Sequence, residues 1–477
     1  MAKKVISLIL VVVVIVAVFF GFNVSKDENQ VITLKLWHYY NSNTRDIFDE
    51  LVQTFNETIG QEEGIIIDAY GFGGVDDLAD AVFGAANKDV GAEEMPDIFA
   101  AYSDNVVRLD ELNLIASLDD YFTKDELNSY RREFIEEGYL GKNEGLKIIP
   151  IAKSTEMIFI NDTDFQKFAS ATGSSYDEFK TWESLAKMAK KYYQWIDDQT
   201  EQLNDGKALF GIDAMANFMI VGNKQLGQEI YLLEDDQIKI NLSKENARKI
   251  WDAFYVPFIQ GHYVANGRFR SDDMKAGDLL AYVGSTSSAS YFPTKIELDK
   301  DNARDIHCVT MPYPVFEDGS KVSIQQGAGM AVTKSNPSKE EAASIFLKWF
   351  TNAKQNNQFA ADTGYMPVKN EGLNENLAKV NQDNIQSVEA TIETMMDQVS
   401  EYELYATIPF DGSFEARKIV EQSLINQAKK DKEIITSEVI KGQDEKIIIE
   451  SMVSDENFNQ WYSLLIKELH TTLEIGG

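Results

Sequence analysis

The chain has few of the residues that build disulfides and metal centres. Its single cysteine, Cys308, excludes an intrachain disulfide and a cysteine-rich metal site. Four histidines are scattered along the chain, at His38, His262, His307 and His470. No two of them stand at the spacing of metal ligands on one element, so the sequence predicts neither a metal nor another cofactor.

Positive charge is also scarce, since 45 Lys and Arg oppose 77 Asp and Glu for a formal net charge of −32. An acidic surface repels phosphate backbones and anionic headgroups, so we expect no nucleic-acid partner and no charge-driven membrane binding. The local motifs G-x-S-x-G, H-E-x-x-H and the P-loop are missing, which favours a protein that is not an enzyme. A glycoside hydrolase remains an alternative. It needs two catalytic carboxylates about 5–10 Å apart, and such a pair cannot be singled out in the sequence among so many acidic residues.

What is present is enough apolar sequence for two domains, with 44% hydrophobic and 11% aromatic residues among 477. At the N-terminus, Lys3 and Lys4 precede an apolar run, Val5–Phe22. The run exceeds a signal-peptide core of ~7–15 residues and is near the lower limit of ~17–25 for a membrane span. Residues 1–30 are therefore interpreted as a signal peptide or an N-terminal membrane anchor. Either reading predicts that the chain is exported, to lie anchored on the extracellular face of the cytoplasmic membrane or to be secreted.

Strands and helices alternate after this segment. The patterns predict strands at Val31–Trp37, Gly64–Tyr70 and Pro96–Ala101, and helices over residues 44–59 and 75–86. This alternation indicates a parallel sheet with helices on its faces, in which ligands bind beyond the carboxyl ends of the strands. Trp37, His38 and Tyr39, and likewise Tyr102 and Asp104, would then lie at the binding edge.

Further along, the chain is expected to pass twice between domains. The first passage is placed at Ile151–Glu156 and the second at His307–Met311. Helices are predicted over residues 181–193, with Thr181 as N-cap, and over residues 244–258. A polar loop follows at Gly284–Ser290, and the region from Asn376 onward is expected to be mostly helical.

Five fragments occur in an order that resembles a known family. They are MPDIFAA (residues 95–101), GLKIIPIAKSTEMIFIND (145–162), TWESLAKMAKK (181–191), MKAGDLLAYVG (274–284) and the stretch from MPYPVFEDGS at Met311 through QQGAGMAV to TGYMPV at Val368. Together they resemble the substrate-binding subunits of bacterial ABC sugar importers, of the maltose, multiple-sugar and glycerol-phosphate type. The resemblance extends from about Leu34 to Lys429.

The resemblance implies an α/β, two-lobed periplasmic-binding-protein-like fold of type II. Each lobe would hold a mainly parallel sheet flanked by helices, with hinge crossings and a helical C-terminal region. Lobe 1 is predicted as residues 31–152 plus 311–352, and lobe 2 as residues 153–310 plus 353–477. The predicted hinge residues are Ile151, Ala152, Lys153, Thr310 and Met311.

Sugars and polyols need aromatic planes for their C–H faces and short polar side chains for their hydroxyls. The candidate ligand-binding residues supply both, and they are Trp37, His38, Tyr39, Tyr102, Asp104, Ser154, Thr155, Glu156, Ser285, Thr286, Tyr291, Gln326, Gly327 and Tyr365. Each ring could instead be core packing, in which case its removal would lower the unliganded melting temperature. Arg417 is the one arginine of the C-terminal third that a phosphate could use, but the sequence does not place it.

The predicted function is capture of a sugar, oligosaccharide or polyol by hinge closure and delivery to the permease subunits of an ABC importer. The protein is expected to act as a monomer. A glycerol-phosphate-type ligand in the same role and a non-transport sugar sensor or adhesion module remain as alternatives. The substitutions Trp37→Ala and Tyr365→Ala are expected to abolish stabilisation by ligand while leaving the unliganded protein stable.

Overall fold

The computed structural model describes residues 31–140, 145–202, 204–235, 237–299, 302–372 and 386–476. The interpretation of residues 1–30 as a signal peptide or anchor falls outside these ranges. Within them, no helix is both long enough and apolar enough to cross a membrane.

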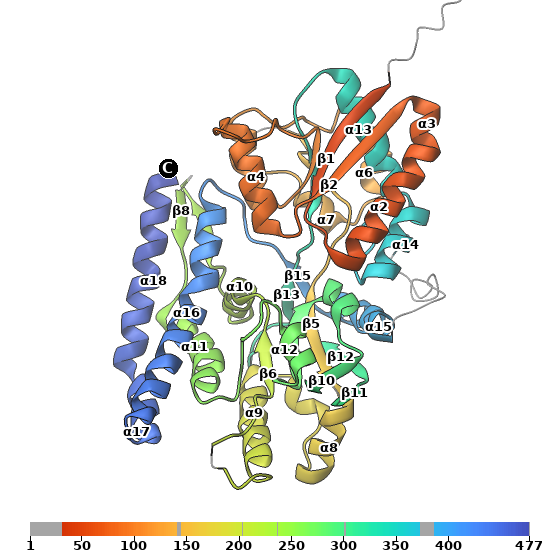
Figure 1. Cartoon of the computed structure of the whole chain (residues 1–477). Coiled ribbons are helices and arrows are strands. Elements are labelled where there is room, and N and C mark those ends of the chain that lie inside the picture. The colour runs from red at the N-terminus through yellow and green to blue at the C-terminus, as the bar shows by residue number, and fades with distance from the viewer. Residues whose placement is uncertain are drawn as a thin grey trace, which may run out of the picture.

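Two sheets organise the chain (Figure 1). The first has five strands in the order β2 (Ile65–Gly71), β1 (Ile32–His38), β3 (Ile98–Ala101), β14 (Gly329–Val332) and β4 (Ile148–Pro150). The second has four strands in the order β12 (Cys308–Pro312), β5 (Glu156–Asn161), β9 (Ala281–Ser285) and β6 (Phe210–Ile212). We call the parts built on them the first lobe and the second lobe.

Helices of the first lobe come from both halves of the chain. They are α2 (Ser42–Glu57), α3 (Ile59–Glu63), α4 (Val75–Asn87), α5 (Ser103–Glu111), α6 (Lys124–Asn128), α7 (Arg132–Glu136), α13 (Pro337–Phe350) and α14 (Ala353–Thr363). The last two are drawn in teal beside the red and orange elements in Figure 1. Asn336 begins α13 by accepting a hydrogen bond from the Lys339 backbone, and Phe346 then packs edge-on against Phe55 of α2.

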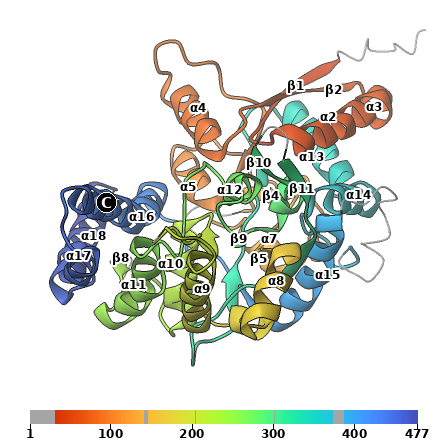
Figure 2. The same cartoon turned by 60° about the horizontal axis from the view of Figure 1, so that its bottom comes forward.

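The second lobe carries the remaining long helices. They are α8 (Asp162–Thr172), α9 (Trp182–Asp197), α10 (Met215–Gln225), α11 (Lys244–Ile259), α12 (Arg270–Ala276), α15 (Gln386–Glu401), α16 (Ser413–Ile440), α17 (Glu445–Met452) and α18 (Asp455–Gly476). Short 3-10 turns, η1 (Tyr176–Phe179) and η2 (Thr286–Tyr291), join them. Figure 2 shows α16, α17 and α18 gathered on one flank beside α10 and α11. Thr181 caps α9 as predicted, and Trp182 is fully buried behind it.

Three two-stranded pairs complete the described fold. They are β7 (Tyr231–Glu234) with β8 (Gln237–Ile240), β10 (Lys295–Asp299) with β11 (Asn302–Asp305), and β13 (Val322–Ile324) with β15 (Glu403–Tyr405). Cys308, in β12, is buried beneath α15, where both its backbone groups bond to the Gln386 amide. Burial raises the pKa of its thiol.

The prediction of mainly parallel sheets is wrong, because both sheets are mixed. In the first, β1 runs parallel to β2 and β3, whereas β14 is antiparallel to β3 and β4. In the second, only β6 and β9 pair in parallel. A strand–helix–strand unit imposes parallel pairing, but a strand that enters a sheet from the other lobe is free to run in either direction.

Two predicted lobe boundaries also differ from the structure. Helix α14 packs against α2 and buries Phe359 there, so residues 353–363 belong to the core of the first lobe, although α14 also touches α15 and η2 of the second lobe. Strand β12 pairs with β5, so residues 311 and 312 lie in the second lobe. Phe359 explains the first difference, because its ring is buried among Tyr40, Phe48 and Phe350.

Candidate functional site

Among the described residues, the chain passes between the sheets at two segments that bond to each other. Residues 151–155 join β4 to β5, and residues 325–328 join β13 to β14. Ser154 N donates to Gln326 O at 2.7 Å, and Gln326 N donates to Ser154 O at 2.9 Å. Gly327 has φ +88°, and a Cβ there would lie 2.4 Å from the Ala152 carbonyl oxygen. Only glycine therefore allows the segments to approach so closely.

The predicted hinge residues divide between the two parts of this arrangement. Ile151, Ala152 and Lys153 lie in the first passage, whereas Thr310 and Met311 lie inside β12 opposite Phe159 and Ile158. The placement of the second passage at His307–Met311 is therefore wrong. An apolar strand that ends at a proline has the same sequence pattern whether it leads into the other lobe or ends within its own. This strand, β12, ends within the second lobe.

A cluster of tyrosines faces the passages from the first lobe. Tyr39 stacks with Tyr102 at a centroid distance of 6.2 Å, and its hydroxyl accepts a hydrogen bond from Ala328 N at 3.3 Å. Tyr365 bonds to Tyr39 and stacks on Phe359 at 5.8 Å. Burial raises the pKa of all three phenols, so they are neutral hydrogen-bonding groups on apolar rings.

A polar cluster faces the same place from the second lobe. Asn217, near the start of α10, donates from Nδ2 to Glu156 Oε1 at 2.7 Å and to Gln326 Oε1 at 3.0 Å. Its Oδ1 accepts from Arg417 Nη2 of α16 at 2.5 Å. The Arg417 charge also acts on Asp104 and Tyr102 of the first lobe, lowering the pKa of both groups against the effect of burial. The candidate site therefore contains groups from both lobes.

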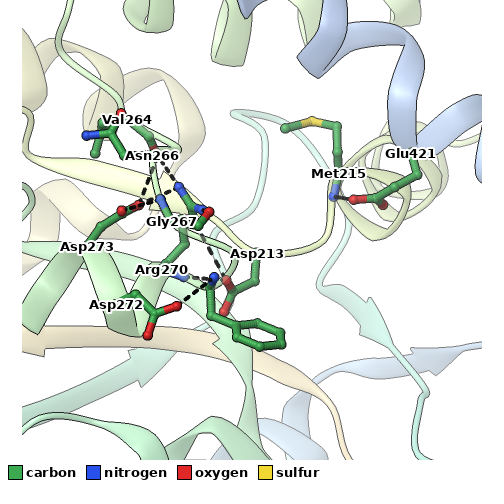
Figure 3. A network of polar contacts seen from close by, with 10 residues as sticks. Asp213, Met215, Val264, Asn266, Gly267, Arg270, Asp272, Asp273 and Glu421 are labelled. Carbon is green, nitrogen blue, oxygen red and sulfur yellow. Dashed lines mark hydrogen bonds and ion pairs between the residues drawn. The ribbon is translucent and has the colours of Figure 1, made fainter. Parts of the chain in front are cut away.

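Carboxylates beside this cluster are held by the protein itself (Figure 3). Asp213, directly after β6, accepts from Arg270 N at 2.7 Å, and burial raises its pKa to about 6. Glu421 of α16 accepts from Met215 N at 3.1 Å and from Ala216 N at 2.5 Å, which satisfies the first turn of α10. The main hydrogen-bond partners of both carboxylates are therefore backbone N–H groups of the protein, not a ligand.

Two other carboxyl oxygens at this junction are buried and have no hydrogen-bond partner within the described chain. They are Glu156 Oε2 and Asp104 Oδ1. A buried oxygen that lacks a hydrogen bond costs ~1–3 kcal/mol, so such atoms at a junction of lobes indicate a ligand that completes them. Burial is also the main cause that raises the pKa of both carboxyls.

Several predicted site residues lie elsewhere. Trp37 is 4% exposed and packs against Phe72, and His38 is fully buried against Phe48 of α2, so both belong to the core. Thr155 bonds to Ser323 and Gln398 behind the passages. Tyr365 is 5% exposed, so removing its ring would destabilise the unliganded protein, contrary to the expectation from sequence.

The remaining predicted residues border the site. Ser285 caps the η2 turn through Ser287, and Ser287 in turn bonds to Tyr365. Thr286 is fully buried beside Gly364. The Tyr291 hydroxyl donates to the Asn41 backbone oxygen at 3.0 Å, which joins the second lobe to the first at the rim.

On the opposite flank, α16 meets α4 and α5. Arg108 Nη1 lies 3.8 Å from Glu415 Oε1, and the Phe83 and Phe414 rings are 6.0 Å apart. Together with Tyr291 and Asn41, these contacts join the lobes on both sides of the site. The structure is thus a closed arrangement.

Sequence reasoning missed Asn217 and Asp213 and left Arg417 unplaced. Asp213 had a usable signal, because it stands at the carboxyl end of the short apolar stretch that forms β6 (Phe210–Ile212). Asn217 had none, since α10 carries apolar residues all round and shows no clear face. Arg417 depends on how α16 packs against α10, which the sequence does not specify.

One larger hollow lies away from this junction. A groove of about 620 Å³ runs between Phe258 near the end of α11 and Ile440 at the end of α16, with Lys429, Lys432 and Lys441 on its walls. None of the predicted site residues borders it. Within the described chain, no group of His, Cys, Asp or Glu side chains could hold a metal ion.

Comparison with known proteins agrees with this architecture. The maltotriose-binding protein of Pyrococcus abyssi is 24% identical over 346 residues, which are 71% of this chain and 67% of the relative. The cyclic α-maltosyl-1,6-maltose binding protein of Arthrobacter globiformis superposes with a TM-score of 0.63 at 15% identity, covering 93% of this chain and 100% of the other. UgpB of Mycobacterium tuberculosis, in complex with glycerophosphocholine, gives a TM-score of 0.63 at 16% identity over 91% and 99%.

These likenesses show the two-lobed periplasmic-binding-protein-like fold, as predicted. A family model described as bacterial extracellular solute-binding protein matches residues 50–384, which is more than half of the chain. The protein therefore belongs to the bacterial extracellular solute-binding protein family.

Proposed function

We propose that the protein captures a sugar, oligosaccharide or polyol between its lobes and delivers it to the permease of an ABC importer. The observation that supports this most directly is the junction itself, where tyrosine rings from one lobe meet hydrogen-bonding groups and unpartnered carboxyl oxygens from the other. Rings suit the C–H faces of a sugar and polar groups suit its hydroxyls. The maltotriose relative has the corresponding ligand in its name.

Closure would supply the mechanism. The first lobe comprises residues 31–152 and 327–372, and the second comprises residues 154–325 and 386–476. The two passages that lie within the described residues meet at Ser154 and Gln326. Rotation about these segments would separate Tyr39 and Tyr102 from Asn217 and Arg417. A ligand that touches both groups binds the closed form better, and only that differential affinity shifts the equilibrium.

The N-terminal run Val5–Phe22 fits this role, because the family acts outside the cytoplasm. We propose that it either directs export and is removed or remains as the anchor of a monomeric receptor beside its permease. Fractionation of cells that express the full chain would distinguish the two, since an anchored form stays with membranes and a processed form is released. N-terminal sequencing would locate any cleavage.

A phosphorylated polyol is the second candidate, and Arg417 is the observation that favours it. Its guanidinium faces the junction, and an arginine fork matches a phosphate oxyanion. Against it, Asp104, Glu156, Asp213 and Glu421 lie around the same arginine or its partner Asn217. Because these acids outnumber the cation, we expect neutral ligands to bind better.

A thermal-shift screen of residues 31–477 tests the proposal. We expect maltotriose or another neutral glycan to raise the melting temperature, since a ligand that binds only the folded state stabilises it. A shift with glycerophosphocholine or glycerol phosphate alone would support the second candidate. No shift with any of these compounds, together with release of glycan fragments on incubation, would overturn the proposal in favour of a hydrolase. Absence of both shift and product would also contradict it.

A further inference from the structure

The Glu156 side chain is buried at the junction of the lobes and hydrogen-bonded on one side only. It is the first residue of β5, directly after the first passage, and its side chain is 1% exposed. Oε1 accepts from Asn217 Nδ2 at 2.7 Å, whereas Oε2 is buried without a partner in the described chain. One oxygen is therefore assigned as an acceptor and the other is left for something outside the protein.

The orientation of the Asn217 amide is determined by three contacts. Nδ2 faces two acceptors, Glu156 Oε1 and Gln326 Oε1, while Oδ1 faces the Arg417 donor. Turning the amide over would place oxygen against two oxygens and N–H groups against a guanidinium. Asn217 thus fixes Glu156 Oε1 as an acceptor, and Arg417 is engaged with the amide.

The charged groups around Glu156 do not favour a carboxylate. Asp213, after β6, and Glu421, on α16, are acids that raise its pKa, and Arg417 is the one cation that lowers it. Tyr313, which follows β12, is a neutral phenol because burial raises its own pKa. With burial as the largest cause, the pKa of Glu156 rises to about 8. A bare carboxylate here would be buried with one oxygen unsatisfied and no cation in contact.

We propose that Glu156 acts in the closed site as a neutral carboxylic acid whose Oε2–H donates to a ligand hydroxyl oxygen, so that it determines specificity for uncharged polyhydroxy compounds. The inference rests on the proposed function, because it names the chemistry by which that same site recognises its ligand. Asp104 complements it from the first lobe, since its unpartnered Oδ1 accepts what a hydroxyl donates.

The protonation state can be tested without any ligand. In the unfolded chain a glutamate titrates near 4.3, so unfolding at pH 5–8 releases a proton and the stability contributed by neutral Glu156 falls as pH rises through that window. The variant Glu156→Gln keeps an acceptor for Asn217 and a donor in place of Oε2–H, but it cannot ionise. We expect its melting temperature to exceed that of the wild type at pH 9 and the difference to shrink at pH 5.

The matched control is Glu63→Gln, which makes the same charge change at an exposed position at the end of α3. Its melting temperature should follow that of the wild type across the same range. If Glu156→Gln also follows the wild type from pH 5 to pH 9, Glu156 is not a buried neutral acid and the inference is overturned. This result does not depend on whether the ligand is a sugar.

Binding of maltotriose by calorimetry tests the role in recognition. With the Glu156 pKa at about 8, the wild-type affinity should fall about tenfold between pH 7 and pH 9, and the Glu156→Gln affinity should change by less than about twofold. At pH 7, Glu156→Ala should bind more weakly than Glu156→Gln, because only glutamine restores the donor.

The outcomes separate the two proposals. Maltotriose could bind with an affinity that does not depend on pH in the wild type, or that depends on pH equally in Glu156→Gln. Either result rejects the role of Glu156 while the proposed function stands. If none of the carbohydrates tested for thermal shift binds, the proposed function fails, and the ligand-free comparison still decides the protonation state.

Discussion

A buried histidine of the first lobe and a buried glutamate of the second lobe respond to pH in opposite directions. In the first lobe, burial lowers the pKa of His38 to about 4, with Arg45 adding to the effect. In the second, burial raises the pKa of Glu156 to about 8. Both groups are therefore neutral near pH 7. Acid therefore destabilises the first lobe through His38, and it does the same to the second lobe through His262, whose pKa burial likewise lowers to about 4. Base destabilises the second lobe through Glu156, which must then ionise where it is buried.

The lobes also contribute different chemistry to their junction. In the first lobe, Tyr39 stacks on Tyr102 and bonds to Tyr365. Most of the packing and hydrogen bonding of these three rings is therefore supplied by the first lobe itself. Glu156 and Asn217, in contrast, form a network that leaves Glu156 Oε2 without a partner. Mutations in the tyrosine cluster should therefore change stability first, and those in the polar cluster should change affinity first.

The largest effect is expected for Tyr365→Ala. Its ring is 5% exposed and stacks on Phe359, so its loss should lower the free energy of unfolding by ~3–5 kcal/mol. Tyr365→Phe keeps the ring and should cost only ~0.5–1.5 kcal/mol, the value of a hydrogen bond. Urea denaturation of the ligand-free protein measures both. An unchanged midpoint for Tyr365→Ala would show that the ring is a ligand surface and not core.

A second prediction concerns acid stability. His38 has a folded pKa below its unfolded value, so its stabilising contribution is lost as pH falls from about 6.5 to about 4. The loss should be roughly 3 kcal/mol, and His38→Gln should remove this contribution from the pH profile of unfolding. Asp49 Oδ1 lies 3.7 Å from Nε2, too far for a hydrogen bond, so it does not reverse the effect of burial. An equally steep profile in His38→Gln would contradict this.

Asn217→Ala should weaken binding of maltotriose by about 10–100-fold. The substitution leaves Glu156, Gln326 and Arg417 without the amide that orients them, and hydrogen bonds to charged groups are worth ~1.5–3 kcal/mol. The matched control is Asn56→Ala, which also loses two hydrogen bonds, both to Ile67, in the first lobe. Calorimetry should show reduced affinity for Asn217→Ala only. Equal affinities of the two variants for maltotriose would show that Asn217 has no role in ligand binding.

The smallest effect is expected at the rim. Tyr291→Phe removes the hydrogen bond to Asn41 across the lobes and should lower affinity about 2–5-fold, in line with ~0.5–1 kcal/mol for an exposed hydrogen bond. Small-angle scattering should show a slightly larger average size at subsaturating ligand. The control is Tyr70→Phe, at a tyrosine of β2 that is 57% exposed. A loss in Tyr70→Phe equal to that in Tyr291→Phe would argue against a role for the rim contact.

Local patterns were sufficient to predict much of the fold. The alternation in residues 31–37 corresponds to β1, which spans Ile32–His38. Thr181, predicted as an N-cap, begins α9. Because strand ends were predictable, Tyr39, Tyr102 and Asp104 could be placed near the junction. What failed were long-range relations. Strand β12 stays in the second lobe and α14 joins the first, and neither pairing partner is visible in the local sequence.

The site was predictable to the same extent. Glu156 was a candidate because it ends the passage, but its partner Asn217 lies 61 positions away on a helix without a distinctive pattern. Trp37 and His38 were misplaced because alternation tells which residues share a face of a strand but not which face meets solvent. Trp37 packs against Phe72, directly after β2, and His38 packs against Phe48 of α2.

The buried Cys308 has a practical consequence. A thiol that is protonated and covered does not react with maleimides, and this one has no second cysteine beside it. A cysteine introduced at Asn41, on the rim, would therefore take up a fluorescent dye selectively. The labelled protein could then report, through the colour or brightness of the dye, each opening and closing in a living culture.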